Sequence, residues 1–147
     1  MIRYGFKKDF ELLIPIRFEA DEHYSKLSGK KSTLTVDEFK KEFDHALSKK
    51  GVLLVAENKS KIVGFLTGTI IDNISRLIGY IDDIVIKSEY QKRGYATSLI
   101  NFFGSEMKSK GIKLIKLGVR TNNDKAIKLY KKLGFSIEYY EMEKELS

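Results

Sequence analysis

Three consecutive apolar runs in the middle of the chain constrain its fold more than any other feature. They read "VLLVAE", "KIVGFLTGTII" and "LIGYIDDIVI", and they occupy residues 52–57, 61–71 and 77–86. Runs of this kind, rich in β-branched residues and separated by turn-forming residues such as "NKSK", are typical of strands. The sequence therefore predicts a sheet at the centre of the chain, whose first two strands form a hairpin.

Helical periodicity precedes and follows these runs. Residues 8–27 carry apolar positions at helical spacing, with Pro15 as an internal break or boundary. Thr35 and Glu38 are typical of a capping box, which predicts a second helix that stops at Gly51. Later patterns predict a helix over 95–109, a strand over 112–119, a short helix over 122–134 and a last strand over 135–146. This order predicts one domain over residues 1–147, with a mixed sheet and helices on both faces.

Composition excludes several classes of protein. The chain has 147 residues and no Cys, so disulfides and thiolate metal sites are excluded, and its two His residues are too few to indicate a metal centre. No apolar run reaches the roughly 18 residues that span a bilayer, and the mixed charges of the N-terminus are not those of a signal peptide. We therefore expect a cytoplasmic protein without a metal and without a membrane partner.

The net charge of +7 comes mostly from lysine. These lysines are spread along the chain and are not interleaved with aromatic residues as in RNA-binding surfaces. The charge therefore indicates a solvated surface, or an acidic substrate, more than a nucleic-acid partner.

The stretch "YQKRGYATSL", residues 90–99, joins the third predicted strand to a predicted helix. A glycine such as Gly94 lets the backbone approach a ligand, and the small Ala96 keeps the surface open. The first amides of the helix have no internal partner, and the helix dipole adds positive potential. Lys92 and Arg93 add charge. These features together predict a phosphate-binding turn, although a plain strand-to-helix connection is the alternative.

Two segments carry a resemblance to a known family. "QKRGYA" (91–96) resembles the Q/R-x-x-G-x-G/A signature of the GCN5-related N-acetyltransferase (GNAT) family. A second block of that family resembles "NNDKAIKLYKKLGF" (122–135), through Asn123, Ala126, Tyr130, Gly134 and Phe135. The resemblance implies an α/β (α+β) fold with a mostly antiparallel sheet, acetyl-CoA as cosubstrate, and an N-acetyltransferase activity.

The resemblance also implies which residues bind the cosubstrate. The third strand would pair its backbone with pantetheine, the glycine turn would bind the pyrophosphate, and an asparagine and a tyrosine of the second block would complete the site. The residues concerned are Ile84, Val85, Ile86, Gln91, Lys92, Arg93, Gly94, Tyr95, Ala96, Thr97, Asn123 and Tyr130. For Asn123 an N-cap is an equal alternative.

Acetylation of an amine needs a proton acceptor for the amine and a proton donor for the departing thiolate. The resemblance places Tyr130 as the donor, with a core aromatic residue as the alternative. It places Asp82 where related enzymes have a Glu, so that Asp82 would accept the proton or position a water. Asp83 would orient the substrate or meet a buried partner, and a purely structural ion pair is the alternative for either residue.

Strand geometry makes a further prediction for this acidic pair. Neighbours on a strand point to opposite faces, so Asp82 is expected to share a face with Tyr80 and Ile84. Asp83 is then expected on the other face.

The acceptor is less defined. A small amine such as a polyamine, amino sugar or amino acid is the main hypothesis, in a pocket built from the N-terminal helices, the loop between them and the last strands. The alternatives are a protein N-terminus or lysine, and a non-catalytic acetyl-CoA-binding module. An exposed last strand over 137–145 would allow a homodimer through edge pairing.

Overall fold

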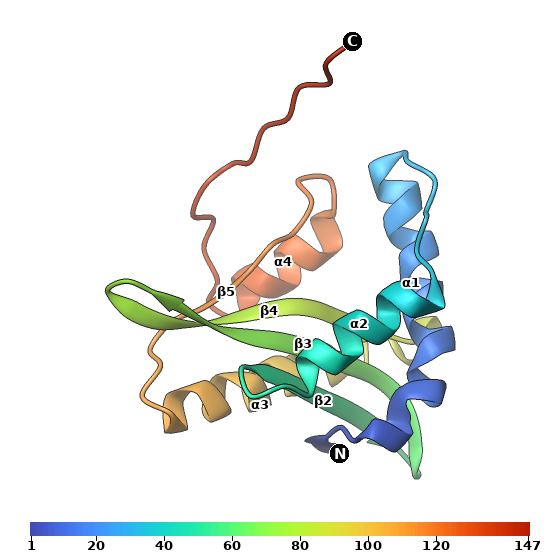
Figure 1. Ribbon diagram of the computed structural model, residues 1–147, viewed down its shortest axis with the longest axis vertical. Helices are drawn as coiled ribbons and strands as arrows, with labels where there is room; N and C mark the ends of the chain where they lie inside the picture. Colours follow the sequence, from blue (N-terminus) through green and yellow to red (C-terminus); the bar gives the residue numbers. More distant parts are fainter.

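The computed structural model describes all residues from 1 to 147 and contains one five-stranded sheet (Figure 1). In chain order the elements are β1 (Ile2–Tyr4), a 3₁₀ turn (Lys7–Asp9), α1 (Phe10–Ser28), α2 (Val36–Ala46), β2 (Gly51–Asn58), β3 (Lys61–Asn73), β4 (Arg76–Ile86), a 3₁₀ turn (Ser88–Tyr90), α3 (Tyr95–Ser109), β5 (Ile115–Leu117) and α4 (Asp124–Lys132). The strands lie in the order β1-β2-β3-β4-β5. Only β4 and β5 are parallel, so the sheet is mixed and mostly antiparallel, as predicted.

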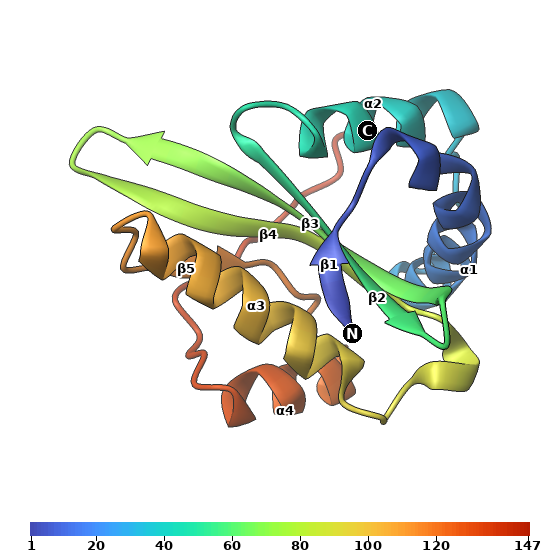
Figure 2. The ribbon, with the colours of Figure 1, turned by 90° about the horizontal axis from the view of Figure 1, so that it is seen from below.

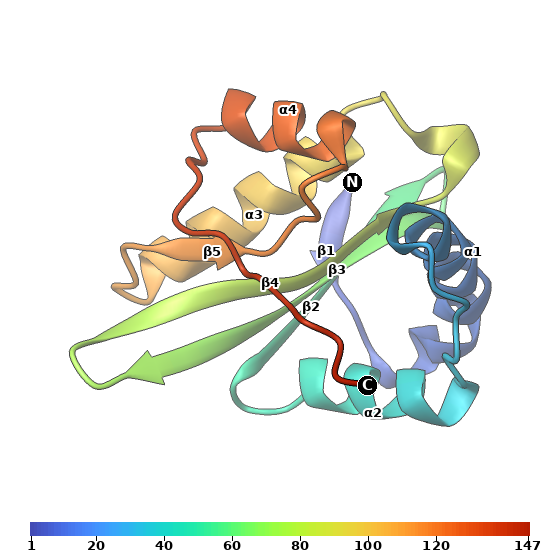
Figure 3. The same cartoon turned by 90° about the horizontal axis from the view of Figure 1, so that it is seen from above.

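Helices cover both faces of this sheet (Figures 2 and 3). The face under α1 and α2 buries Leu53 and Val55 of β2 against Leu13 and Phe43. The opposite face buries the alternate residues of β2 against α3, including Phe103. The alternation of apolar residues along the central strands therefore serves two cores, one on each side.

The two N-terminal helices agree with the sequence in type but not at every boundary. Thr35 caps α2, because its Oγ1 accepts a hydrogen bond from the Glu38 amide at 3.2 Å. α2 ends at Ala46, not at Gly51, which already belongs to β2. α1 continues through Pro15, so the predicted break is wrong. Pro15 removes one backbone bond from an exposed position, and the buried packing of α1 outweighs that loss.

The predicted last strand is wrong. Residues 135–147 belong to no strand, and this tail extends away from the body of the protein (Figure 1). Its side chains alternate as in a strand, yet Ile137, Tyr139 and Met142 are exposed. A strand needs a ladder partner, and no strand of the chain pairs with the tail. The structure adds a strand that the sequence missed, β1, whose three residues are too few for a periodic pattern.

A buried ion pair anchors the N-terminal strand. The Arg3 guanidinium donates to both carboxylate oxygens of the buried Asp9, at 2.9 and 3.0 Å, and the Phe6 amide donates to Asp9 at 2.7 Å. The hydrogen bonds from Arg3 hold the pKa of Asp9 below its ordinary value. Arg3 also reaches Glu57 of β2. Asp9 thus joins the chain start to the sheet.

Replacing Asp9 with Ala is expected to lower the free energy of unfolding by about 3 kcal/mol, because Arg3 loses its buried partner. Urea denaturation at pH 7 measures this loss. Asp44→Ala is the matched control: its pair with Lys40 is exposed, so less than about 1 kcal/mol should be lost. Because the folded pKa of Asp9 is lowered, its stabilisation is present above about pH 4 and is lost as the pH falls further. Equal losses in both variants would contradict this role.

None of the helices combines the length and apolar character needed to cross a bilayer.

Candidate active site

The turn between β4 and α3 has the backbone of an anion-binding site. Gly94 is the N-cap of α3 with φ of +86°, and Lys92 also has a positive φ of +62°. The first bond into the helix is donated by the Ser98 amide to the Gly94 carbonyl at 3.0 Å. The amides of residues 95–97 therefore have no intrahelical partner, and no side chain caps the helix. These amides and the dipole of a 15-residue helix favour an anion at this point.

Side chains of the turn add to this preference. The Arg93 guanidinium stacks over the Tyr90 ring, 5.2 Å from its centroid, which holds a positive charge beside the turn. The Gln91 side chain donates to the Ile86 carbonyl at 3.1 Å and so ties the turn to the end of β4. The residues predicted for pyrophosphate thus lie together around the unpaired amides of residues 95–97.

β4 has an open edge next to this turn. β5 pairs with β4 only through Gly79–Ile81 and Ile115–Leu117. From Asp82 to Ile86, β4 continues without a partner on that side, and the two strands diverge (Figure 3). The backbone of Ile84–Ile86 is therefore available to pair with an extended amide-containing ligand, as a strand would.

A β-bulge places the acidic pair. On β3, Thr67 pairs with Asp83 and the next residue, Gly68, pairs with Ile81, so Asp82 is the extra residue of β4. Ile84 then packs on the α3 side, whereas Asp82 and Asp83 both face α1 and α2. The prediction that the two carboxylates point to opposite faces is wrong, because the bulge interrupts the alternation.

Asp82 is the more exposed member of the pair. Its carboxylate accepts a hydrogen bond from Thr69 Oγ1 at 2.6 Å. The same hydroxyl oxygen lies 2.9 Å from His45 Nε2. Because the Thr69 proton is committed to Asp82, His45 must donate in this contact. The chain His45–Thr69–Asp82 thus orients the carboxylate from the end of α2.

Asp83 is enclosed by α1. Its side chain is 16% exposed, and Arg17 lies 3.2 Å from it. The Tyr24 hydroxyl donates to it at 3.3 Å. Burial raises the pKa of Asp83 to about 6, although the charge of Arg17 acts in the opposite direction. Arg17 also forms ion pairs with Asp21 and Glu42. A carboxylate with a pKa near neutrality suits a proton acceptor.

The charge of this carboxylate raises the pKa of two phenols. Burial raises the pKa of Tyr130, and the charge of Asp83 raises it further. Burial and Asp83 act in the same direction on the pKa of Tyr24. Both hydroxyls therefore stay protonated at neutral pH. The Tyr130 ring also packs edge-on against Phe135 at 5.9 Å, so this residue contributes to the core as well.

Asn123 is an N-cap, which is the alternative role that the sequence gives it. Its Oδ1 accepts a hydrogen bond from the Ala126 amide at 3.3 Å and caps α4. The cap uses the carbonyl end of the side chain, so contact with the cosubstrate through Nδ2 stays a prediction.

Sequence reasoning missed the residues that surround the acidic pair. The sequence predicts no role for Arg17, Tyr24, Thr69 or His45. A signal existed for α1, because Arg17 and Tyr24 interrupt the apolar stripe of its buried face. Thr69 and His45 had no such signal, because only the sheet register brings them to Asp82.

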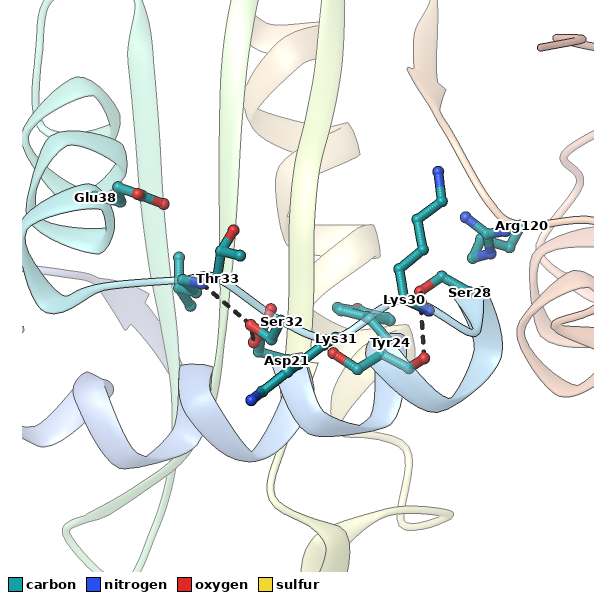
Figure 4. A pocket seen from close by; sticks show the side chains of 11 residues that line it. Asp21, Tyr24, Ser28, Lys30, Lys31, Ser32, Thr33, Glu38 and Arg120 are labelled. Atoms are coloured by element: carbon teal, nitrogen blue, oxygen red, sulfur yellow. Dashed lines mark hydrogen bonds between the residues drawn. The ribbon is translucent and has the colours of Figure 1, made fainter. Parts of the chain in front are cut away.

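An open cavity of about 350 Å³ lies beside the end of α1 (Figure 4), and neither Asp82 nor Asp83 lines it. The end of α1, the α1–α2 loop and Arg120 line it, and Tyr24 is shared between the cavity and Asp83. This is the region in which an acceptor pocket was predicted.

Replacing Gly94 with Asp is expected to weaken acetyl-CoA binding by at least about tenfold, because it places a carboxylate beside the free amides. A Cβ at this position meets no atom within 4 Å, so steric exclusion is not the cause. Gly94→Ala is the control, since it imposes the same positive φ without the charge. Calorimetric titration measures both. Equal affinities for the two variants would contradict an anion site here.

Comparison with known proteins agrees with this geometry. The acetyltransferase (GNAT) family model matches residues 17–135. Among solved structures, the BH1408 protein of Bacillus halodurans, in a tetramutant form, is 21% identical with a TM-score of 0.87, covering 99% of each chain. An aminoglycoside acetyltransferase from an uncultured soil metagenomic sample is 18% identical with a TM-score of 0.74, covering 100% of this chain and 95% of the other.

A glucosamine-6-phosphate N-acetyltransferase from Arabidopsis thaliana is 20% identical with a TM-score of 0.73, covering 100% of this chain and 98% of the other. No curated protein sequence matches the chain. At these identities the solved structures show a shared fold, and the family model shows the family. The chain belongs to the acetyltransferase (GNAT) family of acetyl-CoA-dependent N-acetyltransferases.

Proposed function

We propose that this protein transfers the acetyl group of acetyl-CoA to the primary amine of a small molecule, by direct attack in a ternary complex. The observation that carries the proposal is the continuity of the site. The anion-binding turn, the open edge of β4 and the Asp83 carboxylate follow one another along a single strand and its turn. A thioester bound at the turn and along the edge would bring its carbonyl towards the acidic pair. The chain has no Cys to form an acetyl-thioester enzyme.

Asp83 is the proposed proton acceptor, with a water between it and the amine where the distance requires one. A free alkylammonium has a pKa near ~10, so the site must attract it and then take its proton. The partly buried Asp83 does both as a carboxylate. Asp82, exposed and held by Thr69, is proposed to attract the amine or to position that water.

Tyr130 is the proposed proton donor to the departing thiolate. Its protonated state at neutral pH, favoured by burial and by the charge of Asp83, supports this role. The backbone of Ile84–Ile86, the turn residues 91–97 and the Nδ2 group of Asn123 are proposed to bind the cosubstrate. The proposed reaction needs no metal ion.

The acceptor class is tested by thiol release from acetyl-CoA with a panel of amines. The panel contains a polyamine, an amino sugar, free amino acids and short peptides, and mass spectrometry identifies the product. Faster turnover with small amines than with peptides supports the proposal. Preference for peptides would assign a protein acetyltransferase, and binding of acetyl-CoA without any turnover would assign a non-catalytic module.

We also propose a homodimer, although not through the edge strand that the sequence predicts. Residues 137–145 form no edge strand, but their apolar side chains are exposed and their backbone has no ladder partner. A second copy of the chain is the proposed partner for this segment.

A further inference from the structure

The cavity beside Tyr24 has a basic end. Lys30 comes from the loop after α1 and Arg120 from the segment after β5, and their side chains extend to the same side of the cavity (Figure 4). The Asn122 side chain donates to the Leu27 carbonyl at 2.8 Å, which fastens these two segments to each other. The two cations are thus brought together by elements about 90 residues apart in sequence.

Little negative charge compensates this end. Arg120 takes part in none of the ion pairs of the protein. Lys30 lies 3.8 Å from Glu143 of the tail, but the two side chains are 75% and 84% exposed, so an incoming anion can replace Glu143. Asp21, the nearer acid of the lining, is engaged by Ser32 and Arg17. Glu38 lies at the far end of the cavity from Lys30 and Arg120 (Figure 4).

The Asp83 carboxylate lies on the other side of Tyr24. Tyr24 lines the cavity next to Lys30 (Figure 4), and its hydroxyl donates to Asp83, which is not part of the lining. The two cations of the cavity and the Asp83 carboxylate therefore flank the same side chain, Tyr24. A polyamine would place one of its own cations against Lys30 and Arg120, and this repulsion would select against it.

We infer that the acceptor is an amine that also carries an anionic group, a phosphate or a carboxylate. The anion lies against Lys30 and Arg120, and the amine meets Asp83. Arginine suits this role because its planar fork binds either oxyanion through two parallel hydrogen bonds. The inference deepens the proposed function and rests on it, since it names the class of acceptor for the same site.

Matched pairs of acceptors test the inference. Glucosamine 6-phosphate is compared with glucosamine, and a free amino acid with its amide, by kcat/KM for thiol release. The anionic member of at least one pair is expected to be preferred by about tenfold or more. The pair that shows the preference tells phosphate from carboxylate. Equal or better turnover of both neutral members, or of spermidine, would overturn the inference and leave the proposed function intact.

Variants tie the preference to the basic end. The double change K30A and R120A is expected to reduce the ratio of kcat/KM between the anionic and neutral members by about tenfold. Lys41→Ala is the control, because Lys41 is an exposed lysine of α2 that makes no ion pair, and it should keep the wild-type ratio. A double variant that kept the full ratio would overturn the inference.

Binding separates this inference from the proposed function. If no amine is acetylated, calorimetry with the CoA-loaded protein must still show tighter binding of an anionic member than of its neutral partner. Equal binding or no binding would overturn the inference. Tighter anionic binding without turnover would support it, and the missing turnover would count against the proposed function alone.

Discussion

Replacing Asp83 with Asn is expected to lower kcat/KM for the amine by about 100-fold or more, the usual contribution of a positioned proton acceptor. The change keeps the size of the side chain and its contact with Tyr24. It removes the charge, and with it the ion pair to Arg17, and the ability to take a proton. Steady-state kinetics at pH 8 measures the loss, and a thermal melt checks that the variant is folded.

The pH profile gives the sharper form of this prediction. Because burial raises the pKa of Asp83 to about 6, wild-type kcat/KM should fall as the pH drops through about 6. The Asn variant should lack this acid limb of the pH profile, the fall of kcat/KM below about pH 6. The stability effect has the opposite sign: a carboxyl whose folded pKa is raised favours the protonated protein, so its contribution to stability declines as the pH rises from about 4 through 6.

Asp82→Asn is the matched control for this assignment. Asp82 is exposed and accepts a hydrogen bond from Thr69, so its loss is expected to cost less than about tenfold and to leave the limb near pH 6 in place. If the Asp82 variant lost more activity than the Asp83 variant, or alone lost the limb, the proton acceptor would be Asp82.

Tyr130→Phe is expected to lower kcat by about 100-fold with the affinity for acetyl-CoA nearly unchanged. The phenyl ring keeps its packing against Phe135, so the fold and the cosubstrate site should persist. Only the proton for the departing thiolate is lost. Initial rates at saturating substrates and calorimetric titration of acetyl-CoA separate the two effects.

Tyr24→Phe is the contrasting variant. The Tyr24 hydroxyl donates to Asp83 and favours its ionised form. Its removal should therefore move the acid limb to higher pH and leave the plateau rate less affected than Tyr130→Phe does. A Tyr130 variant with the parent kcat would assign Tyr130 to the core alone.

The elements that the sequence predicts well are those whose signal is local. The periodic apolar stripe of α3, the cap at Thr35 and the turn before Gly94 all depend on residues within one or two turns of each other. The prediction of the last strand is wrong for the converse reason. Its alternation is local, but a strand exists only with a partner, and the chain supplies none for residues 135–147.

The same distinction divides the candidate site. The turn "QKRGYA" was recognisable because a short segment carries all of its amides and charges. The acidic pair was recognisable as a pair, but its geometry depends on a register shift against β3. The pKa of Asp83 depends on Arg17 and Tyr24, about 60 residues away in the chain. Such contacts have no signature in a single sequence.

Initial rates of thiol release with both acetyl-CoA and the amine varied test the central claim most directly. Direct transfer in a ternary complex predicts that release depends on the amine, that each thiol appears with one acetylated amine, and that reciprocal plots intersect. Release that is independent of the amine, or parallel reciprocal plots that indicate an acetylated enzyme, would contradict the account.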